Sequence, residues 1–154
     1  MAGGAINFFS SKFPNSQFYG FDSFEGLPEN WRPGFEKGTF SFNGMLPKVN
    51  ANVKLIPGWF NESLPYFLEN VNFESNVFIH MDCDLYSSTK DVFDIIGEKL
   101  KGSVYILFDE YFNYPFWEYH EFKAFHEFIK KFNYKYEYVA VNLDNQQVLI
   151  KISI

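Results

Sequence analysis

The stretch of residues 77–88 constrains the fold of this chain more than any other. It opens with an apolar run at residues 77–79 and then changes to two carboxylates, Asp82 and Asp84, ahead of a helical pattern. A short apolar run with such boundaries is typical of a buried strand in a parallel sheet. Parallel α/β sheets gather reactive side chains at the carboxyl ends of their strands. The stretch therefore predicts an α/β fold with a candidate site directly after this strand.

A second strand pattern ends in the same way. Residues 104–108 are apolar and run straight into Asp109 and Glu110. Two strands that end in acids predict three or four carboxylates converging on one pocket. Carboxylates side by side repel one another, and a bound cation is their natural neutraliser.

The rest of the chain alternates between helical and extended patterns. Helices are predicted over residues 1–13, 62–69, 88–100 and 115–132, and strands over residues 18–21, 53–56, 136–141 and 148–152. Asn61 is the predicted cap of the second helix, and residues 88–91 have the form of a capping box for the third. The last two strands are joined by a polar turn, which predicts an antiparallel hairpin. Together these patterns predict a single α/β domain over residues 1–154.

Residues 23–52 contain four glycines and three prolines and show no regular pattern. A segment of this length is too long for an idle connection in a compact domain, so it predicts a lid or binding loop. A partly disordered insertion is the alternative.

Composition excludes several classes of function. The net charge is −6 with no basic run, which argues against nucleic-acid binding. The single cysteine, Cys83, excludes an internal disulfide and a cysteine-built zinc site. No apolar run approaches the roughly 20 residues of a membrane span, and no signal-peptide pattern opens the chain. A cytoplasmic protein without a membrane partner is the expectation.

Four blocks in order resemble the macrocin O-methyltransferase (TylF/MycF-type) family of class I S-adenosylmethionine-dependent methyltransferases. These blocks are residues 21–28, 58–65, 82–89 and 109–111. The resemblance implies a doubly wound Rossmann-like methyltransferase sheet, mostly parallel with a C-terminal antiparallel hairpin. It also implies that the first central strand and most of the glycine-rich turn are missing, because the chain opens with the tail of that turn.

The resemblance implies a binding site for S-adenosyl-L-methionine. Asp22 would hydrogen-bond the ribose hydroxyls, since two acceptor oxygens suit a vicinal diol, and residues 58–60 would supply an aromatic wall near the adenine. A turn-forming aspartate and ordinary core packing are the competing interpretations. The cofactor-binding residues carried over are Gly3, Gly4, Asp22, Ser23, Trp59, Phe60 and Asp82.

The resemblance also implies a divalent-cation triad of Asp82, Asp109 and Glu110. Hard oxygen donors suit Mg²⁺, which would lower the pKa of the hydroxyl to be methylated. Asp84 is interpreted as a loop or helix-start residue and left outside the triad. His120 joins Asp82 as a predicted catalytic residue, because an imidazole can act as general base near neutral pH. An ordinary surface histidine is the alternative.

The leading hypothesis is an S-adenosylmethionine-dependent, Mg²⁺-assisted O-methyltransferase acting on a hydroxyl of a sugar or glycosylated small molecule. One alternative is a non-catalytic, truncated methyltransferase fold that serves as a binding or homo-oligomer-forming module. Another is an Asp-x-Asp metal-dependent phosphatase or glycosyltransferase, which would use Asp82 and Asp84. Tyr86 argues against the phosphatase, because a small hydroxyl residue is expected at its position.

Overall fold

The structure is a computed structural model that describes residues 3–71, 73 and 76–154. The chain divides into two compact units, Met1–Ser63 and Leu64–Ile154. They are described one at a time. Helix α2 (Phe60–Asn70) begins in the first unit and continues in the second. No helix in the described part of the chain is long and apolar enough to cross a bilayer.

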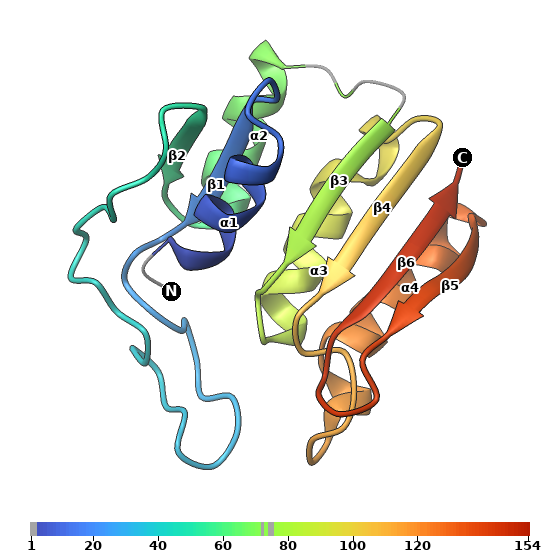
Figure 1. Ribbon diagram of the computed structural model, residues 1–154. Coiled ribbons are helices and arrows are strands. Elements are labelled where there is room, and N and C mark those ends of the chain that lie inside the picture. The colour runs from blue at the N-terminus through green and yellow to red at the C-terminus, as the bar shows by residue number, and fades with distance from the viewer. Residues whose placement is uncertain (1–2, 72, 74–75) are drawn as a thin grey trace. The chain divides into compact units, whose positions relative to one another are not determined.

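The first unit holds helix α1 (Gly4–Lys12) and two parallel strands, β1 (Phe18–Asp22) and β2 (Val53–Pro57). Figure 1 shows the two strands side by side with α1 next to them. The side chain of Asn52 anchors the end of the helix, because its Nδ2 donates to the carbonyl oxygens of Ser10, Phe13 and Ser16 at 3.2, 3.3 and 3.0 Å. These elements confirm the helix and strands predicted for this part of the chain, except that residues 1 and 2 of the predicted helix lie outside the described residues.

The segment between β1 and β2 contains no helix or strand, as predicted, but it has hydrogen bonds of its own. Leu27 N donates to Thr39 O, and Gly38 N donates to Leu27 O, both at 2.9 Å. Gly26 lies next to these two hydrogen bonds and has φ +85°. A Cβ at this position would come within 2.5 Å of the carbonyl oxygens of Gly38 and Thr39. Only glycine fits such a position. The role of the segment as a lid remains a prediction.

The second unit is built on a four-stranded sheet. The strands are β3 (Asn76–Met81), β4 (Ser103–Phe108), β5 (Lys135–Val141) and β6 (Val148–Ser153), in the order β3-β4-β6-β5. β3 and β4 run parallel with Met81 opposite Phe108, whereas β6 pairs antiparallel with both β4 and β5. The predicted antiparallel hairpin is therefore confirmed. In the described residues the strands form two separate sheets.

Two helices, α3 (Tyr86–Ile96) and α4 (Glu121–Phe132), cover one face of this sheet (Figure 1). The short 3₁₀ helices η1 (Gly97–Lys99) and η2 (Trp117–Tyr119) lie beside them in the chain. Aromatic rings fill the space between the helices and the sheet. Phe93 stacks on Phe128 with 4.4 Å between the ring centroids, and Phe125 contacts Phe108 edge to face with 5.5 Å between the centroids. These phenylalanines thus form a core that holds β4 and the two helices together.

Four local predictions are wrong. Asn61 does not cap α2, because the helix has already begun at Phe60. The capping box fails as well: α3 begins at Tyr86 with Leu85 as its N-cap, and the hydroxyl of Thr89, fully buried, donates to Leu85 O at 2.9 Å. β3 is not buried on both faces, since Phe78 is 45% exposed. The helix predicted over residues 115–132 starts too early: η2 replaces its first turns, and α4 begins only at Glu121.

Candidate functional site

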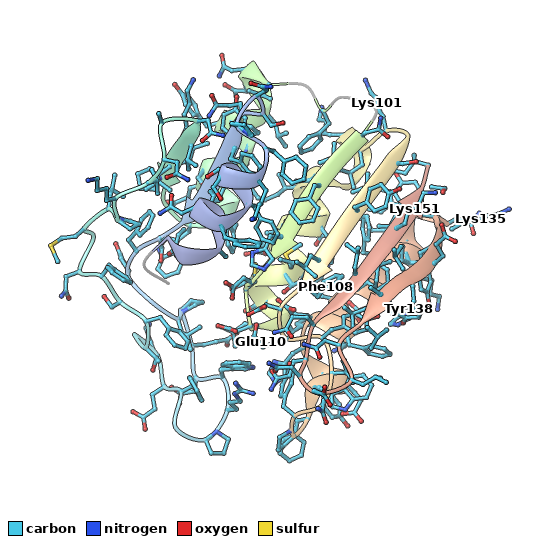
Figure 2. The ribbon with its side chains drawn as sticks, viewed as in Figure 1. Lys101, Phe108, Glu110, Lys135, Tyr138 and Lys151 are labelled. Carbon is cyan, nitrogen blue, oxygen red and sulfur yellow. The ribbon has the colours of Figure 1, made fainter. Side chains whose placement is uncertain are left out.

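The carboxyl ends of β3 and β4 meet at one edge of the four-stranded sheet. Their parallel register places Met81 beside Phe108, and Asp109 N donates to Met81 O at 2.9 Å. The residues after both strands therefore start from neighbouring positions. In Figure 2 the labels of Phe108 and Glu110 mark this end of β4.

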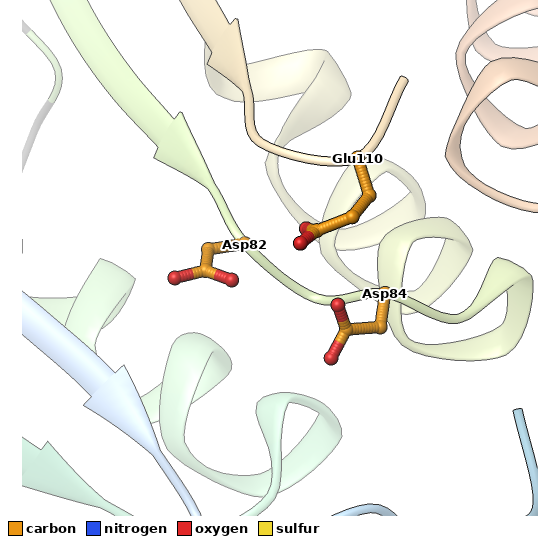
Figure 3. A group of neighbouring side chains, drawn as sticks. All are labelled: Asp82, Asp84 and Glu110. Atoms are coloured by element: carbon orange, nitrogen blue, oxygen red, sulfur yellow. The ribbon is translucent and has the colours of Figure 1, made fainter. Parts of the chain in front are cut away.

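Three carboxylates converge at this edge. Asp82, Asp84 and Glu110 each offer an oxygen, and these oxygens lie within 4.8 Å of one another. Figure 3 shows the Glu110 carboxylate extending toward the two aspartates. Asp84 is buried, has a left-handed backbone at φ 62° and lies two residues after Asp82, whose side chain is exposed. We call Asp82, Asp84 and Glu110 the acidic group.

Asp84 is the member that the sequence interpretation left out. It was interpreted as a loop or helix-start residue, and the structure does place it in the loop between β3 and α3, with its carboxylate beside that of Asp82. The Asp-x-Asp spacing itself was the signal that could have found it.

Asp109 lies outside the acidic group and has other neighbours. Its Oδ1 accepts a hydrogen bond from Gln147 Nε2 at 3.2 Å and lies 4.0 Å from Nε2 of His80. The triad implied by the resemblance, Asp82, Asp109 and Glu110, therefore stays a prediction. Two of its members are brought together here, with Asp84 as the third carboxylate.

The electrostatics of the acidic group are unfavourable without a cation. Burial, followed by the charges of Asp84, Asp109 and Asp82, raises the pKa of the Glu110 carboxyl to about 9. Its Oε2 is buried and has no hydrogen-bond partner among the described residues. Hard carboxylate oxygens in this arrangement fit Mg²⁺, which would supply the positive charge that the site lacks.

A further buried acid, Glu121, lies behind the loop that carries the two aspartates. It is fully buried, and its Oε1 accepts a hydrogen bond from Cys83 N at 3.1 Å. Burial, followed by the charge of Glu110, raises the pKa of Glu121 well above its ordinary value. Burial and the charges of Glu121, Asp82 and Asp84 raise the pKa of the Cys83 thiol, which argues against a role for this cysteine as a nucleophile. Nothing in the sequence pattern pointed to Glu121.

His120, the predicted base, directly precedes α4 as its N-cap residue and is half-buried. Its ring lies 6.1 Å from that of Tyr114, measured between centroids. Its catalytic role stays a prediction.

The residues predicted to bind the cofactor lie mainly in the first unit. Asp22 ends β1, and its Oδ1 accepts a hydrogen bond from Phe24 N at 2.7 Å, so it forms a turn as the competing interpretation held. Ser23 Oγ accepts from Glu25 N at 3.1 Å. The other four are placed as follows: Gly3 is the N-cap of α1 with φ 79°, Gly4 begins that helix, Trp59 precedes α2 and Phe60 begins it. Their cofactor role stays a prediction. In that prediction the second carboxylate oxygen of Asp22 would accept a hydrogen bond from a ribose hydroxyl.

The raised pKa of Glu110 predicts a pH dependence for the metal-free protein. Because the folded state keeps this proton up to about pH 9 whereas the unfolded carboxyl releases it near 4.5, the folded state binds more protons between these values. Stability is therefore expected to fall as the pH rises through this window. Thermal unfolding in a chelator at several pH values measures the slope, and Mg²⁺ should stabilise most at the alkaline end. Glu110→Gln should show a shallower slope than the wild type; an equal slope would contradict the assignment.

Comparison with known proteins tests these expectations. A family model described as Macrocin-O-methyltransferase (TylF) matches residues 8–141. The chain belongs to the macrocin O-methyltransferase family. A curated relative of this macrocin O-methyltransferase homologue is the 8-demethyl-8-(2,3-dimethoxy-alpha-L-rhamnosyl)-tetracenomycin-C 4'-O-methyltransferase of Streptomyces olivaceus, 30% identical over 108 residues, which are 58% of this chain and 40% of the relative.

Solved structures show the same fold. The O-methyltransferase NovP aligns with a TM-score of 0.69 at 20% identity, over 96% of this chain and 66% of NovP. The calicheamicin methyltransferase CalS11 also gives 0.69 at 20% identity, over 96% of this chain and 67% of its own. The predicted methyltransferase-like α/β fold is thereby confirmed. This macrocin O-methyltransferase homologue spans less than half of the curated relative and about two thirds of the solved structures.

Proposed function

We propose that this protein is an S-adenosylmethionine-dependent, Mg²⁺-assisted O-methyltransferase acting on a hydroxyl of a sugar or glycosylated small molecule. Membership of an O-methyltransferase family supports the reaction type. The observation that carries the Mg²⁺ assistance is the acidic group, three carboxylates within 4.8 Å of one another. The family also favours methyl transfer over the Asp-x-Asp phosphatase and glycosyltransferase alternatives.

The relatives support a sugar as the class of acceptor. The Streptomyces olivaceus relative is named for a rhamnosyl-bearing compound, and CalS11 is described as a TDP-rhamnose 3'-O-methyltransferase. We therefore extend the proposal to a hydroxyl on a deoxysugar ring. Vicinal oxygens on such a ring suit a hard cation held by carboxylates.

In the proposed mechanism the acidic group positions the cation and the substrate oxygens. Asp82 and Glu110 belong both to this group and to the triad implied by the resemblance, so they are the proposed core of the site. When bound, Mg²⁺ lowers the pKa of the substrate hydroxyl, and S-adenosylmethionine supplies the methyl group. His120 is the proposed acceptor of the hydroxyl proton, with Asp82 holding the reacting oxygen in place. Much of the rate then comes from the alignment of oxygen and methyl group.

The proposal is tested by calorimetric titration of the natural protein with S-adenosylhomocysteine, with and without Mg²⁺. Saturable one-to-one binding is expected. The same protein should then transfer a labelled methyl group to a nucleotide-linked or natural-product-linked deoxysugar. Absence of any S-adenosylhomocysteine binding would contradict the proposal and favour the non-catalytic binding module.

A further inference from the structure

Glu121 occupies an unusual place for an acid. It is the first residue of α4, and its side chain is fully buried, with 0% exposure. A buried carboxylate is costly unless its oxygens are paired. Such a group in a native structure calls for an explanation.

The described residues donate a hydrogen bond to only one of the two oxygens of the Glu121 carboxylate. Oε1 accepts the hydrogen bond from Cys83 N at 3.1 Å, whereas the buried Oε2 has no hydrogen-bond partner there. Cys83 is the residue between Asp82 and Asp84. A hydrogen bond to its peptide therefore fixes the stretch of backbone from which both aspartate side chains project.

The charges around Glu121 also connect this residue with the acidic group. The carboxylates close enough to act on it electrostatically are Glu110, Asp84 and Asp82, the three members of the acidic group. Helix dipoles favour an acid at the first turn, yet they do not explain an oxygen without a donor. A donor that enters together with a cation would explain it, because the water ligands of Mg²⁺ are strong hydrogen-bond donors.

We propose that Glu121 is a positioning residue of the cation site. Its Oε1 holds the Cys83 peptide and so sets the directions of Asp82 and Asp84, and its Oε2 accepts a hydrogen bond from a water ligand of the bound divalent cation. The inference rests on the proposed cation site and adds to it a residue that the family motifs did not indicate.

The test compares Mn²⁺ binding, followed by electron paramagnetic resonance and by competition with Mg²⁺, in the natural protein and three variants. Glu121→Gln keeps the size of the side chain and an acceptor for Cys83 N, but it has no second acceptor oxygen. Its Mn²⁺ affinity should fall about 10- to 100-fold, as for other groups that orient metal ligands. Glu121→Leu loses both acceptors and should bind at least as weakly. Glu118→Gln, which removes an exposed acid three positions earlier, should change the affinity less than about twofold.

Thermal unfolding in a chelator separates this role from a merely structural one. Glu121→Gln should unfold at or above the wild-type temperature, because it removes a buried acid from acidic surroundings. Unchanged Mn²⁺ affinity in Glu121→Gln would overturn the inference about Glu121 while leaving the cation site intact. If the wild type itself binds no Mn²⁺, the cation site and the inference both fall.

Discussion

Asp82→Asn is expected to lower kcat/KM for methyl transfer at least about 100-fold, because a bound cation contributes several kcal/mol of transition-state stabilisation and Asp82 is proposed to hold it. Asp82 directly follows β3 and belongs both to the acidic group and to the triad implied by the family. The asparagine keeps the size of the side chain and removes its charge. Steady-state kinetics at saturating S-adenosylmethionine measures the effect, and Mn²⁺ affinity should fall with it.

A matched control is available in the same sheet. Asp144 is an exposed acid in the turn between β5 and β6, outside every set of residues assigned to the site, so Asp144→Asn should keep wild-type kinetics. If Asp82→Asn retained more than about a third of the wild-type kcat/KM, a loss of less than about 0.7 kcal/mol, the proposed role of Asp82 would be wrong.

Measurements of Mn²⁺ binding also identify the third ligand of the proposed cation site. The acidic group places Asp84 beside Asp82 and Glu110, whereas the family resemblance places Asp109 there. We expect Asp84→Asn to weaken Mn²⁺ binding at least about tenfold, because it removes one of three charges that the cation would neutralise. Asp109→Asn measured alongside tells whether Asp109 also contributes. Unchanged binding in Asp84→Asn with a large loss in Asp109→Asn would restore the triad.

Phe125→Ala is expected to lower the free energy of unfolding by about 3–5 kcal/mol, the usual cost of removing a fully buried phenylalanine side chain. Phe125 is 0% exposed, and its ring centroid lies 5.5 Å from that of Phe108 in β4 and 6.2 Å from that of Phe93 in α3. It also contacts Tyr136 in β5 edge to face at 5.1 Å. One ring therefore joins α4 to α3 and to two strands of the sheet, so its removal would leave a cavity lined by several elements.

Urea denaturation followed by circular dichroism measures this loss. Phe125→Leu refills most of the cavity and should lose clearly less stability than the alanine variant. Phe116→Ala removes an exposed ring of the same type, 67% exposed, and should change the free energy of unfolding by less than about 0.5 kcal/mol. A loss below about 1 kcal/mol in Phe125→Ala would contradict the assignment of this ring to the core.

The strands, the order of the elements and the family could all be predicted from the amino-acid sequence. The apolar runs of β3 and β4 are short and end abruptly in acids, and such local patterns depend little on the rest of the chain. Phe125 and Phe128 in α4 have the spacing of one helix face, and both are buried. The starts of α2 and α3 were predicted less well. The capping box predicted at residues 88–91 lies inside α3, where the hydroxyl of Thr89 donates within the helix to Leu85 O.

The composition of the acidic group was decided by tertiary structure. Residues 82 and 110 converge because β3 and β4 pair in parallel, which their sequence suggested. The Asp-x-Asp spacing pointed to Asp84, but its left-handed backbone was not predictable from that spacing. Glu121 meets the same loop from a helix 38 residues away along the chain, held there by the aromatic packing of α4. Contacts between distant segments depend on how whole elements pack, and a local sequence pattern does not specify that packing.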